Sequence, residues 1–239
     1  MTFDVETKDC TALSDGELAD MADIVADGPA GLDIGVLSKQ RDEWVLITQV
    51  RVTGRLMGFS FCTLERIGGT PCILWGLVSV TRCVEREAIL DALRADQFRK
   101  AVLAFPDEDV LVGTRFIDAG AFAALAGLED ICPRPAHKPT GEERAWSRRL
   151  AKRFGAEGRI DDRAFVVTGD GTATGVFDYS AAEAETVPGD GLEGGAPADP
   201  STVPADVAAF FEPLDRARRD VLIAFGWGMA EDLASRYAP

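Results

Sequence analysis

The chain has 239 residues, of which 46% are hydrophobic, and this is enough apolar material for a sizeable core. Its 40 acidic and 25 basic residues give a formal net charge of −15, which repels phosphate backbones and anionic lipid. Broad binding to nucleic acid or to a membrane surface is therefore not expected. The charge favours solubility or, as a sharper hypothesis, attraction of a small cationic amine substrate.

Cysteine and histidine usage argues against a structural zinc site and for a reducing compartment. The only histidine is His137, and the five cysteines form no C-x-x-C pair. Their odd number is typical of reduced, buried thiols, and no leader-like or membrane-spanning apolar run is present, so a cytoplasmic location is predicted. The cysteines are Cys10, Cys62, Cys72, Cys83 and Cys132.

The first half of the chain predicts a helix followed by an antiparallel meander. Ser14 and Glu17 have the spacing of a helix cap, and apolar residues follow at helical spacing up to the breaker at 27–29. Three β-branched, apolar runs joined by short turns then predict three strands. Gly76 inside the last run indicates a bulge or the close approach of another backbone, or it is simply a packing glycine. The strands are predicted at 44–52, 56–64 and 71–80.

A crossover is predicted after the meander. The period becomes helical from Glu85 to Leu103, and the apolar run 110–117 follows as a buried strand. A strand, a helix and another strand are most simply a right-handed crossover to a parallel neighbour. A short helix is expected over 119–128, before the prolines at 133 and 135.

The second half has a different composition. A basic helix is predicted over 142–154, and a hairpin is predicted from 165–168 and 175–179, with its turn at 169–171. Residues 181–206 are rich in Gly, Pro, Ala and acidic residues, which is typical of a flexible loop. An apolar last helix over about 206–236 is expected to dock on the body or on a second copy in a homodimer.

These elements predict an α/β (α+β) fold, a mixed and mostly antiparallel central sheet flanked by helices. The expected organisation is a first domain, a helix and hairpin completing the same sheet, a flexible loop and a docking C-terminal helix. The corresponding ranges are 1–135, 136–180, 181–206 and 207–239.

The order helix, three-strand meander, helix, strand, helix resembles the GCN5-related N-acetyltransferase (GNAT) superfamily over roughly residues 10–135. The most similar stretch runs from Gly54–Phe59 to Leu77–Val80. The resemblance implies an acyl-CoA N-acyltransferase-like fold, with acetyl-CoA or CoA bound where the third strand passes into the next helix, and a small-molecule amine as acceptor. Spacing from the strand gives Val78, Val80, Arg82, Arg86 and Ala88 as the cofactor-binding residues implied.

The matching turn departs from the family pattern. Glu85 stands where the family has Arg or Gln, and Arg86 and Glu87 bring side chains where glycine would admit a pyrophosphate. The crevice beyond the carboxyl end of the third strand, toward the strand at 110–116, is the expected ligand entrance, with phosphates near Arg82 and Arg86.

Candidates for the acid and base of acyl transfer are few. Glu43 and Glu65 lie on or beside central strands and are the candidate bases, although a carboxylate at a strand edge facing water is the commoner arrangement. Tyr179 and Tyr237 do not stand where the family has its acid, and His137 has no Ser or Cys partner at a recognisable spacing. Two hypotheses remain: a CoA-dependent N-acetyltransferase of unknown amine acceptor, and a non-catalytic binding or interaction module.

Overall fold

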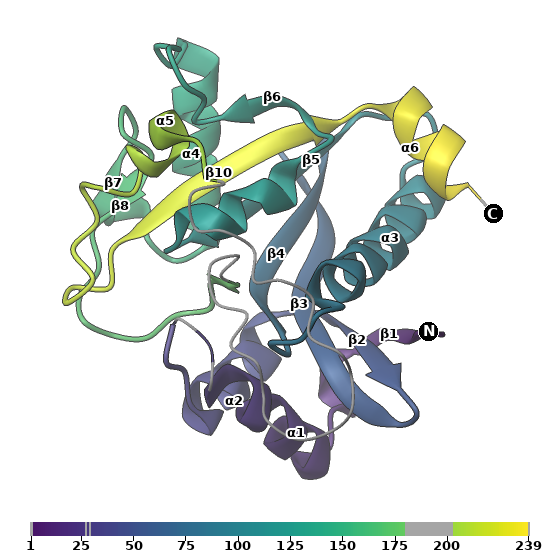
Figure 1. Ribbon diagram of the computed structural model, residues 1–239. Coiled ribbons are helices and arrows are strands. Elements are labelled where there is room, and N and C mark those ends of the chain that lie inside the picture. Colours follow the sequence, from purple (N-terminus) through teal and green to yellow (C-terminus); the bar gives the residue numbers. More distant parts are fainter. Residues whose placement is uncertain (1, 27, 29, 180–202, 239) are drawn as a thin grey trace.

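One mixed sheet runs through the centre of the protein, whose computed structural model describes residues 2–26, 28, 30–179 and 203–238 (Figure 1). Among these residues the strand order is β1-β2-β3-β4-β9-β5-β10-β8-β7, and β6 pairs with β10. The pairs among β4, β9 and β5 are parallel, and the other described pairs are antiparallel. The strands are β1 (Asp4–Asp9), β2 (Leu46–Val52), β3 (Arg55–Ile67), β4 (Thr70–Val80), β5 (Val110–Phe116), β6 (Glu129–Cys132), β7 (Ile160–Asp161), β8 (Val166–Val167), β9 (Phe177–Asp178) and β10 (Val221–Gly228).

Helices cover both faces of this sheet, so the predicted fold class is confirmed. On one face, Phe98 of α3 meets Trp75 of β4. On the opposite face, Leu150 of α4 lies against Gly113 of β5, and Trp44, at the end of α2, lies against Gly76 of β4. The helices are α1 (Asp15–Ala26), α2 (Ile34–Glu43), α3 (Arg86–Ala104), α4 (Gly141–Arg153), α5 (Ala205–Ala208) and α6 (Ala230–Tyr237), with short 3-10 helices η1 (Cys10–Ala12), η2 (Ala119–Leu125) and η3 (Glu157–Arg159).

The first half of the chain follows its local sequence signals. The Ser14 hydroxyl accepts a hydrogen bond from the Glu17 amide, and the Glu17 carboxylate accepts one from the Ser14 amide. This reciprocal pair caps α1 as predicted. The meander β2–β3–β4 is also present, and its register slips between Ser60 and Cys62. The extra residue on β4 falls at Gly76–Leu77, so the bulge alternative is confirmed, and the group packed against Gly76 is the side chain of Trp44 rather than another backbone.

The predicted crossover is confirmed. After β4 the chain forms α3 and returns as β5, and Cys72–Leu74 pair in parallel with Leu111–Gly113. Two elements near the start of the chain were not predicted. Strand β1 pairs with β2 at the edge of the sheet. Its sequence, DVETKD, is largely polar, as an edge strand allows, and so it carries little strand signal. Helix α2 is short and has only three buried residues, so its apolar periodicity is weak.

The prediction of a last helix over about 206–236 is wrong for most of that range. Residues 221–228 form strand β10 between β5 and β8, and nearly all of them are buried. A continuous apolar run such as VLIAFGWG does not distinguish a buried helix from a strand buried on both faces. Helix occurs only at α5 and α6, before and after this strand.

Two further expectations need correction. The predicted hairpin does not form, because β8 pairs with β7 and β10, while Phe177 and Asp178 enter the sheet elsewhere as β9. The helix expected over 119–128 is the 3-10 helix η2, and the chain then continues as β6. Most of the predicted loop over 181–206 lies outside the described residues, which resume at 203.

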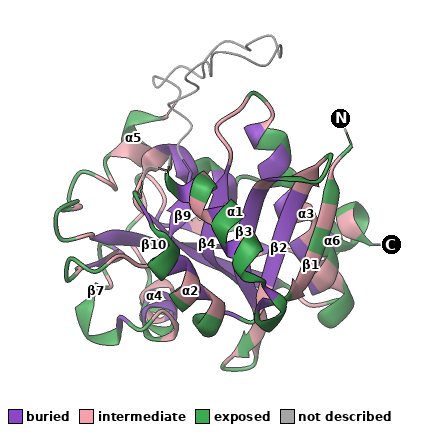
Figure 2. Cartoon of the chain, turned by 90° about the horizontal axis from the view of Figure 1, so that it is seen from below, coloured by how far each residue is buried: buried purple, intermediate pink, exposed green. Residues whose placement is uncertain are grey.

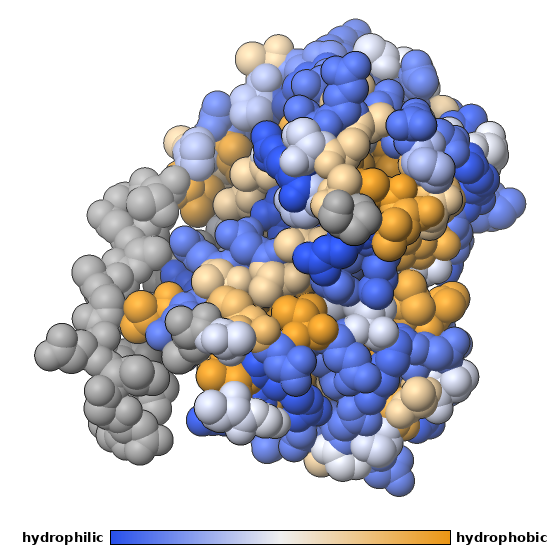
Figure 3. Space-filling view, turned by 90° about the vertical axis from the view of Figure 1, so that its right-hand side faces the viewer, coloured by the Kyte–Doolittle hydropathy of each residue, from blue (hydrophilic) through white to orange (hydrophobic). Residues whose placement is uncertain are grey.

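Buried residues concentrate in the central strands and on the inward sides of the helices (Figure 2). Phe210 and Phe211, from the segment after α5, contact the ring of Phe122 in η2 with centroids 6.3 and 6.2 Å apart. On the face seen in Figure 3, apolar residues form separate patches among hydrophilic ones. No helix among the described residues is long and apolar enough to cross a membrane.

Candidate functional site

Strands β4 and β5 separate toward their carboxyl ends, and β9 lies in the wedge between them (Figure 1). They pair with each other only at Cys72–Leu74 and Leu111–Gly113. Farther along, Val78 of β4 and Phe116 of β5 both have Phe177 as their partner. The expected ligand entrance is therefore occupied by a segment of the chain itself.

Phe177 anchors β9 in the apolar core. Its side chain is 1% exposed, and its ring centroid lies 5.7 Å from that of Trp75 and 5.3 Å from that of Phe116. The amide of Val78 donates a 3.1 Å hydrogen bond to the carbonyl of Val176, so β9 also satisfies the open side of β4. Burial of an aromatic ring on this scale contributes about 2–3 kcal/mol to folding.

Asp178 joins the wedge to the segment between α1 and α2. Its carboxylate is 2% exposed and accepts hydrogen bonds from the Ser79 hydroxyl at 3.0 Å and from the Ala30 amide at 2.7 Å. Burial raises the pKa of Asp178, whereas these two hydrogen bonds and the charge of Arg82 act in the opposite direction. Gly28 packs so tightly on this carboxylate that an added Cβ would lie 1.9 Å from its Oδ2 atom.

The residues implied for cofactor binding surround β9 rather than an open groove. Val78 and Val80 are buried at 2% and 7% exposure, and Ala88 faces solvent. Arg86 is buried at the first turn of α3, with its guanidinium 5.8 Å from the centre of the Tyr179 ring. The hollow between Arg82, Arg86 and Tyr179 measures only about 10 Å³, whereas a larger hollow lies on the α1 side of Arg82.

The wedge between β4 and β5 has no room for a CoA arm in this conformation. The hollow of about 10 Å³ holds no more than a water molecule, and β9 fills the wedge that an extended cofactor arm would need. Glu85 occupies the N-cap position of α3, but its side chain makes no capping hydrogen bond. Glu87 lies in the first turn of the same helix. Both carboxylates would repel a pyrophosphate.

The two candidate bases lie away from the wedge and serve other contacts. Glu43 is exposed at the end of α2 and accepts a 2.8 Å hydrogen bond from the Gln40 amide group. Glu65 on β3 pairs with Arg153 of α4, with 2.7 Å between the Arg153 Nε and Glu65 Oε1 atoms. Their proximity to Arg115, Arg153 and aromatic rings indicates a structural role on the α2 and α4 side of the sheet.

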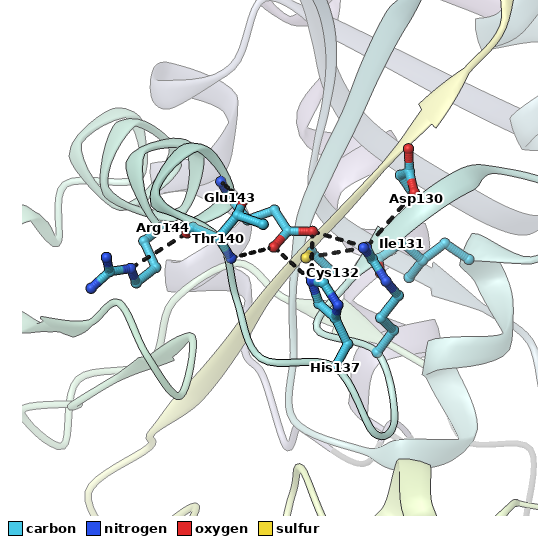
Figure 4. A network of polar contacts seen from close by, with 8 residues as sticks. Asp130, Ile131, Cys132, His137, Thr140, Glu143 and Arg144 are labelled. Atoms are coloured by element: carbon cyan, nitrogen blue, oxygen red, sulfur yellow. Dashed lines mark hydrogen bonds and ion pairs between the residues drawn. The ribbon is translucent and has the colours of Figure 1, made fainter.

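The structure brings Cys132, His137 and Glu143 together, which their sequence spacing did not suggest (Figure 4). Glu143 accepts hydrogen bonds from the Thr140 amide at 2.6 Å and interacts with His137 Nε2 at 2.8 Å and Arg134 at 3.0 Å. Burial raises the pKa of Glu143, but the hydrogen bonds from Thr140, His137 and Cys132 outweigh it and lower this pKa to about 2.

This cluster does not have the chemistry of a thiol nucleophile. Burial and then the carboxylate of Glu143 raise the pKa of Cys132 to about 12, so the thiol stays protonated at neutral pH. Thr140 and Glu143 form a capping box at the start of α4. The cluster therefore fixes the start of a helix, and neither it nor any other group among the described residues has three His, Cys, Asp or Glu side chains arranged to hold a metal ion.

A cavity of about 300 Å³ lies next to the wedge, at the carboxyl end of β5. It is bounded by the residues after β5, the approach to β9, the start of β10 and the segment before α2. Another hollow of about 280 Å³ lies between α1 and the β2–β3 turn, where Arg55 and Arg82 face Asp20 and Asp23. The first cavity is lined by Ala30, Leu32, Ile117, Asp118, Thr174, Val176, Leu214, Arg216, Ala217, Arg219, Asp220 and Val221.

Comparison with known proteins gives a partial likeness to acetyltransferases of known structure. The ribosomal-protein-S18-alanine N-acetyltransferase from Escherichia coli is 15% identical, with 58% of this chain and 86% of that chain covered and a TM-score of 0.40. The aminoglycoside 6'-N-acetyltransferase from Enterococcus faecium is 12% identical, with coverages of 49% and 64% and a TM-score of 0.37. The AAC(6')-Iy structure, solved with the bisubstrate analogue CoA-S-monomethyl-acetylneamine, is 13% identical, with coverages of 47% and 79% and a TM-score of 0.35.

Many of the similar solved structures are GNAT acetyltransferases, and the likeness is one of fold, at low sequence identity. No protein-family model matches the sequence. No curated protein matches it either.

Proposed function

We propose that this protein is a non-catalytic, small-molecule-binding module built on an acyltransferase-like fold. The observation that supports this best is the position of β9. A groove between two parallel strands is where an open α/β sheet ordinarily binds its ligand. Here Phe177 and Asp178 occupy that groove with buried aromatic contacts and two hydrogen bonds to the carboxylate.

The charges beside the groove support the same proposal. A turn that holds a pyrophosphate presents free backbone amides and avoids negative side chains. Glu85 and Glu87 stand at the start of α3, where a CoA pyrophosphate would otherwise lie. The cavity beside β5, of about 300 Å³, borders the wedge and offers a ligand a space that β9 does not fill.

Calorimetry and thermal unfolding with acetyl-CoA and CoA test this proposal. The expected result is no saturable heat and no shift of the unfolding temperature. A ligand at 100 times its dissociation constant would add about 2.7 kcal/mol to the free energy of unfolding, so binding would be readily visible. Saturable binding of either compound by the unaltered protein would overturn the proposal.

A second function, acetyl-CoA-dependent N-acetylation of an unknown amine, is favoured by one contact. The Val78 amide donates to the carbonyl of an extended segment, Val176. The pantetheine arm of CoA is also an extended chain with amide carbonyls, and it would find the same donor if β9 left the wedge. In this hypothesis the fold is that of an enzyme whose cofactor groove is closed in the described conformation.

Opening the wedge distinguishes the two functions. A Phe177→Ala, Asp178→Asn double variant removes the aromatic anchor and the buried charge while keeping a hydrogen-bonding side chain at 178. For a binding module, this variant still gives no heat with acetyl-CoA and no acetylation of a panel of amines. Phe225→Ala, at an equally buried site on β10, controls for lost stability alone. Acetyl-CoA binding by the double variant but not by Phe225→Ala would favour the enzyme.

A further inference from the structure

We infer that the cavity beside β5 binds a small organic monocarboxylate with an apolar body. This inference deepens the proposed binding function by assigning its site and the chemical class of its ligand. The cavity measures about 300 Å³, which is within the range of small-molecule sites in proteins. It opens where the segment before α2, the residue after β5 and the start of β10 meet.

The inner wall of the cavity is aliphatic. Its apolar side chains come from four separate segments, so a ligand there would be enclosed by the folded body rather than by one loop. Leu32 and Val221 are buried at 5% and 3% exposure and form a fixed part of the wall. An apolar ligand body would gain binding free energy from the surface that it buries against such a wall. The aliphatic residues are Leu32, Ile117, Val176, Leu214 and Val221.

The charged residues of the cavity favour one negative charge. Arg216 and Arg219 both line it, together with Asp118 and Asp220. Asp220 is matched by Arg218, whose guanidinium lies 2.8 Å from its carboxylate. Asp118 lies 3.9 Å from Arg216 and caps η2 through the Gly120 amide. Asp220 also accepts hydrogen bonds from the Gly169 and Asp215 amides, so both carboxylates are engaged by the protein, and Arg216 and Arg219 are the charged side chains placed to face an anion.

Arg219 is held across the cavity by an unusual backbone conformation. Its φ angle is 59°, in the left-handed region that residues other than glycine rarely adopt. Its guanidinium donates to the Ala30 carbonyl at 3.3 Å, so the side chain spans from the start of β10 to the segment before α2. The backbone thus places a cation over an aliphatic wall, and a carboxylate can bind its remaining N–H groups.

A buried cation behind the wall adds to this preference. Arg115 is 5% exposed, and its guanidinium donates at 2.9 Å to the hydroxyl of Thr174, which lines the cavity. Burial lowers the pKa of Arg115 to about 10, so it remains positively charged at neutral pH. Glu43 partly balances the charge of Arg115, so the preference for a carboxylate rests mainly on Arg216 and Arg219, while Asp118 and Asp220 oppose a doubly charged anion.

Calorimetry with paired probes tests the inference on the full chain. Phenylacetate and hexanoate carry the carboxylate, phenylacetamide keeps the shape without charge, and phenethylamine reverses the charge. We expect saturable binding of the two carboxylates, weakened by added salt, and at least tenfold weaker binding of the amide and the amine. Arg216→Gln and Arg219→Gln should each weaken phenylacetate binding roughly tenfold. Arg149→Gln, on α4 and outside the cavity lining, is the matched control and should change nothing.

Arg216 is 81% exposed on its side chain, so Arg216→Gln tests the site even if Arg219→Gln lowers stability. Ala217→Leu narrows the cavity without changing charge and should also weaken binding. Absence of carboxylate binding, tighter binding of the amine, or binding unchanged in both arginine variants would overturn the inference. Binding of acetyl-CoA in the separate assay would overturn the proposed function while leaving a carboxylate site intact.

Discussion

The wedge between β4 and β5 and the cavity beside β5 both lie at the carboxyl ends of these strands, but they are built from different side chains. The wedge holds an aromatic residue and a carboxylate whose contacts are all within the protein, Phe177 and Asp178. The cavity has aliphatic walls and arginines at its mouth, including Arg216, which is largely exposed. The comparison shows that position on a fold does not identify the site, because the groove expected from topology is the part that the chain fills.

The largest effect is expected from Phe177→Ala in the wedge. Removing a ring that contacts Trp75 and Phe116 should lower the free energy of unfolding by about 3–5 kcal/mol, measured by urea denaturation. Leu214→Ala, in the wall of the cavity, should cost about 1 kcal/mol because this residue is only partly buried. Equal losses would contradict the distinction between a packed wedge and an open cavity.

Substitutions at Asp178 separate its charge from its hydrogen bonds. Asp178→Ala leaves the Ala30 amide without its acceptor and should cost about 1–3 kcal/mol. Asp178→Asn keeps an acceptor for Ala30 and should cost less.

The pH dependence of these variants follows from the raised pKa of Asp178. Burial disfavours the ionised form, so the stability of the unaltered protein relative to Asp178→Asn should fall as pH rises from the ordinary value of 3.8 through the raised pKa. Above that pKa the difference should be constant. Denaturation curves from pH 4 to pH 8 measure it, and an opposite slope would show that the hydrogen bonds outweigh burial.

A smaller loss is expected from Gly28→Ala. The added methyl group would lie 1.9 Å from the Asp178 carboxylate, so the backbone must move, at a cost of about 1–2 kcal/mol. Gly141→Ala, with no atom within 4 Å of the new Cβ, is the control and should be neutral or slightly stabilising. Equal thermal unfolding temperatures for the two variants would show that the α1–α2 segment does not lock β9.

The smallest effect on stability is expected from Arg216→Gln at the cavity. Its ion pair with Asp118 is long and exposed, so the free energy of unfolding should change by less than about 0.5 kcal/mol. Urea denaturation without ligand measures this change. A larger loss would show that Arg216 is structural and would weaken its use as a probe of binding.

The sequence predicted local elements well where the signals were local. The Ser14 and Glu17 cap, the meander and the crossover from β4 to β5 depend on residues close together in the chain. Strand β10 was not predictable from periodicity, because a strand buried on both faces has no alternation. The two residues of β9 were predicted as part of a strand, but that strand was assigned to a hairpin that does not form.

The candidate site was less predictable than the fold. The role predicted for Val78 and Arg86 in cofactor binding stays a prediction. The segment that fills the expected groove, Phe177 and Asp178, comes about a hundred residues later in the sequence. The residues that line the cavity come from short segments far apart in the sequence. Asp118 and Arg219, for example, are brought to the same cavity only by the fold. The left-handed backbone at Arg219 leaves no mark in the sequence, since arginine is not a residue that favours it.

Strand β10 also has a consequence for biosynthesis. Its pairing with β5, β6 and β8 means that the middle of the sheet is completed by a segment that leaves the ribosome after all the other described strands. Until Val221–Gly228 emerges, β5 has an open, apolar edge, and such edges pair readily with other nascent chains. Translation past this strand should therefore be the step at which the chain becomes resistant to aggregation, and a chaperone that shields β5 would act before it.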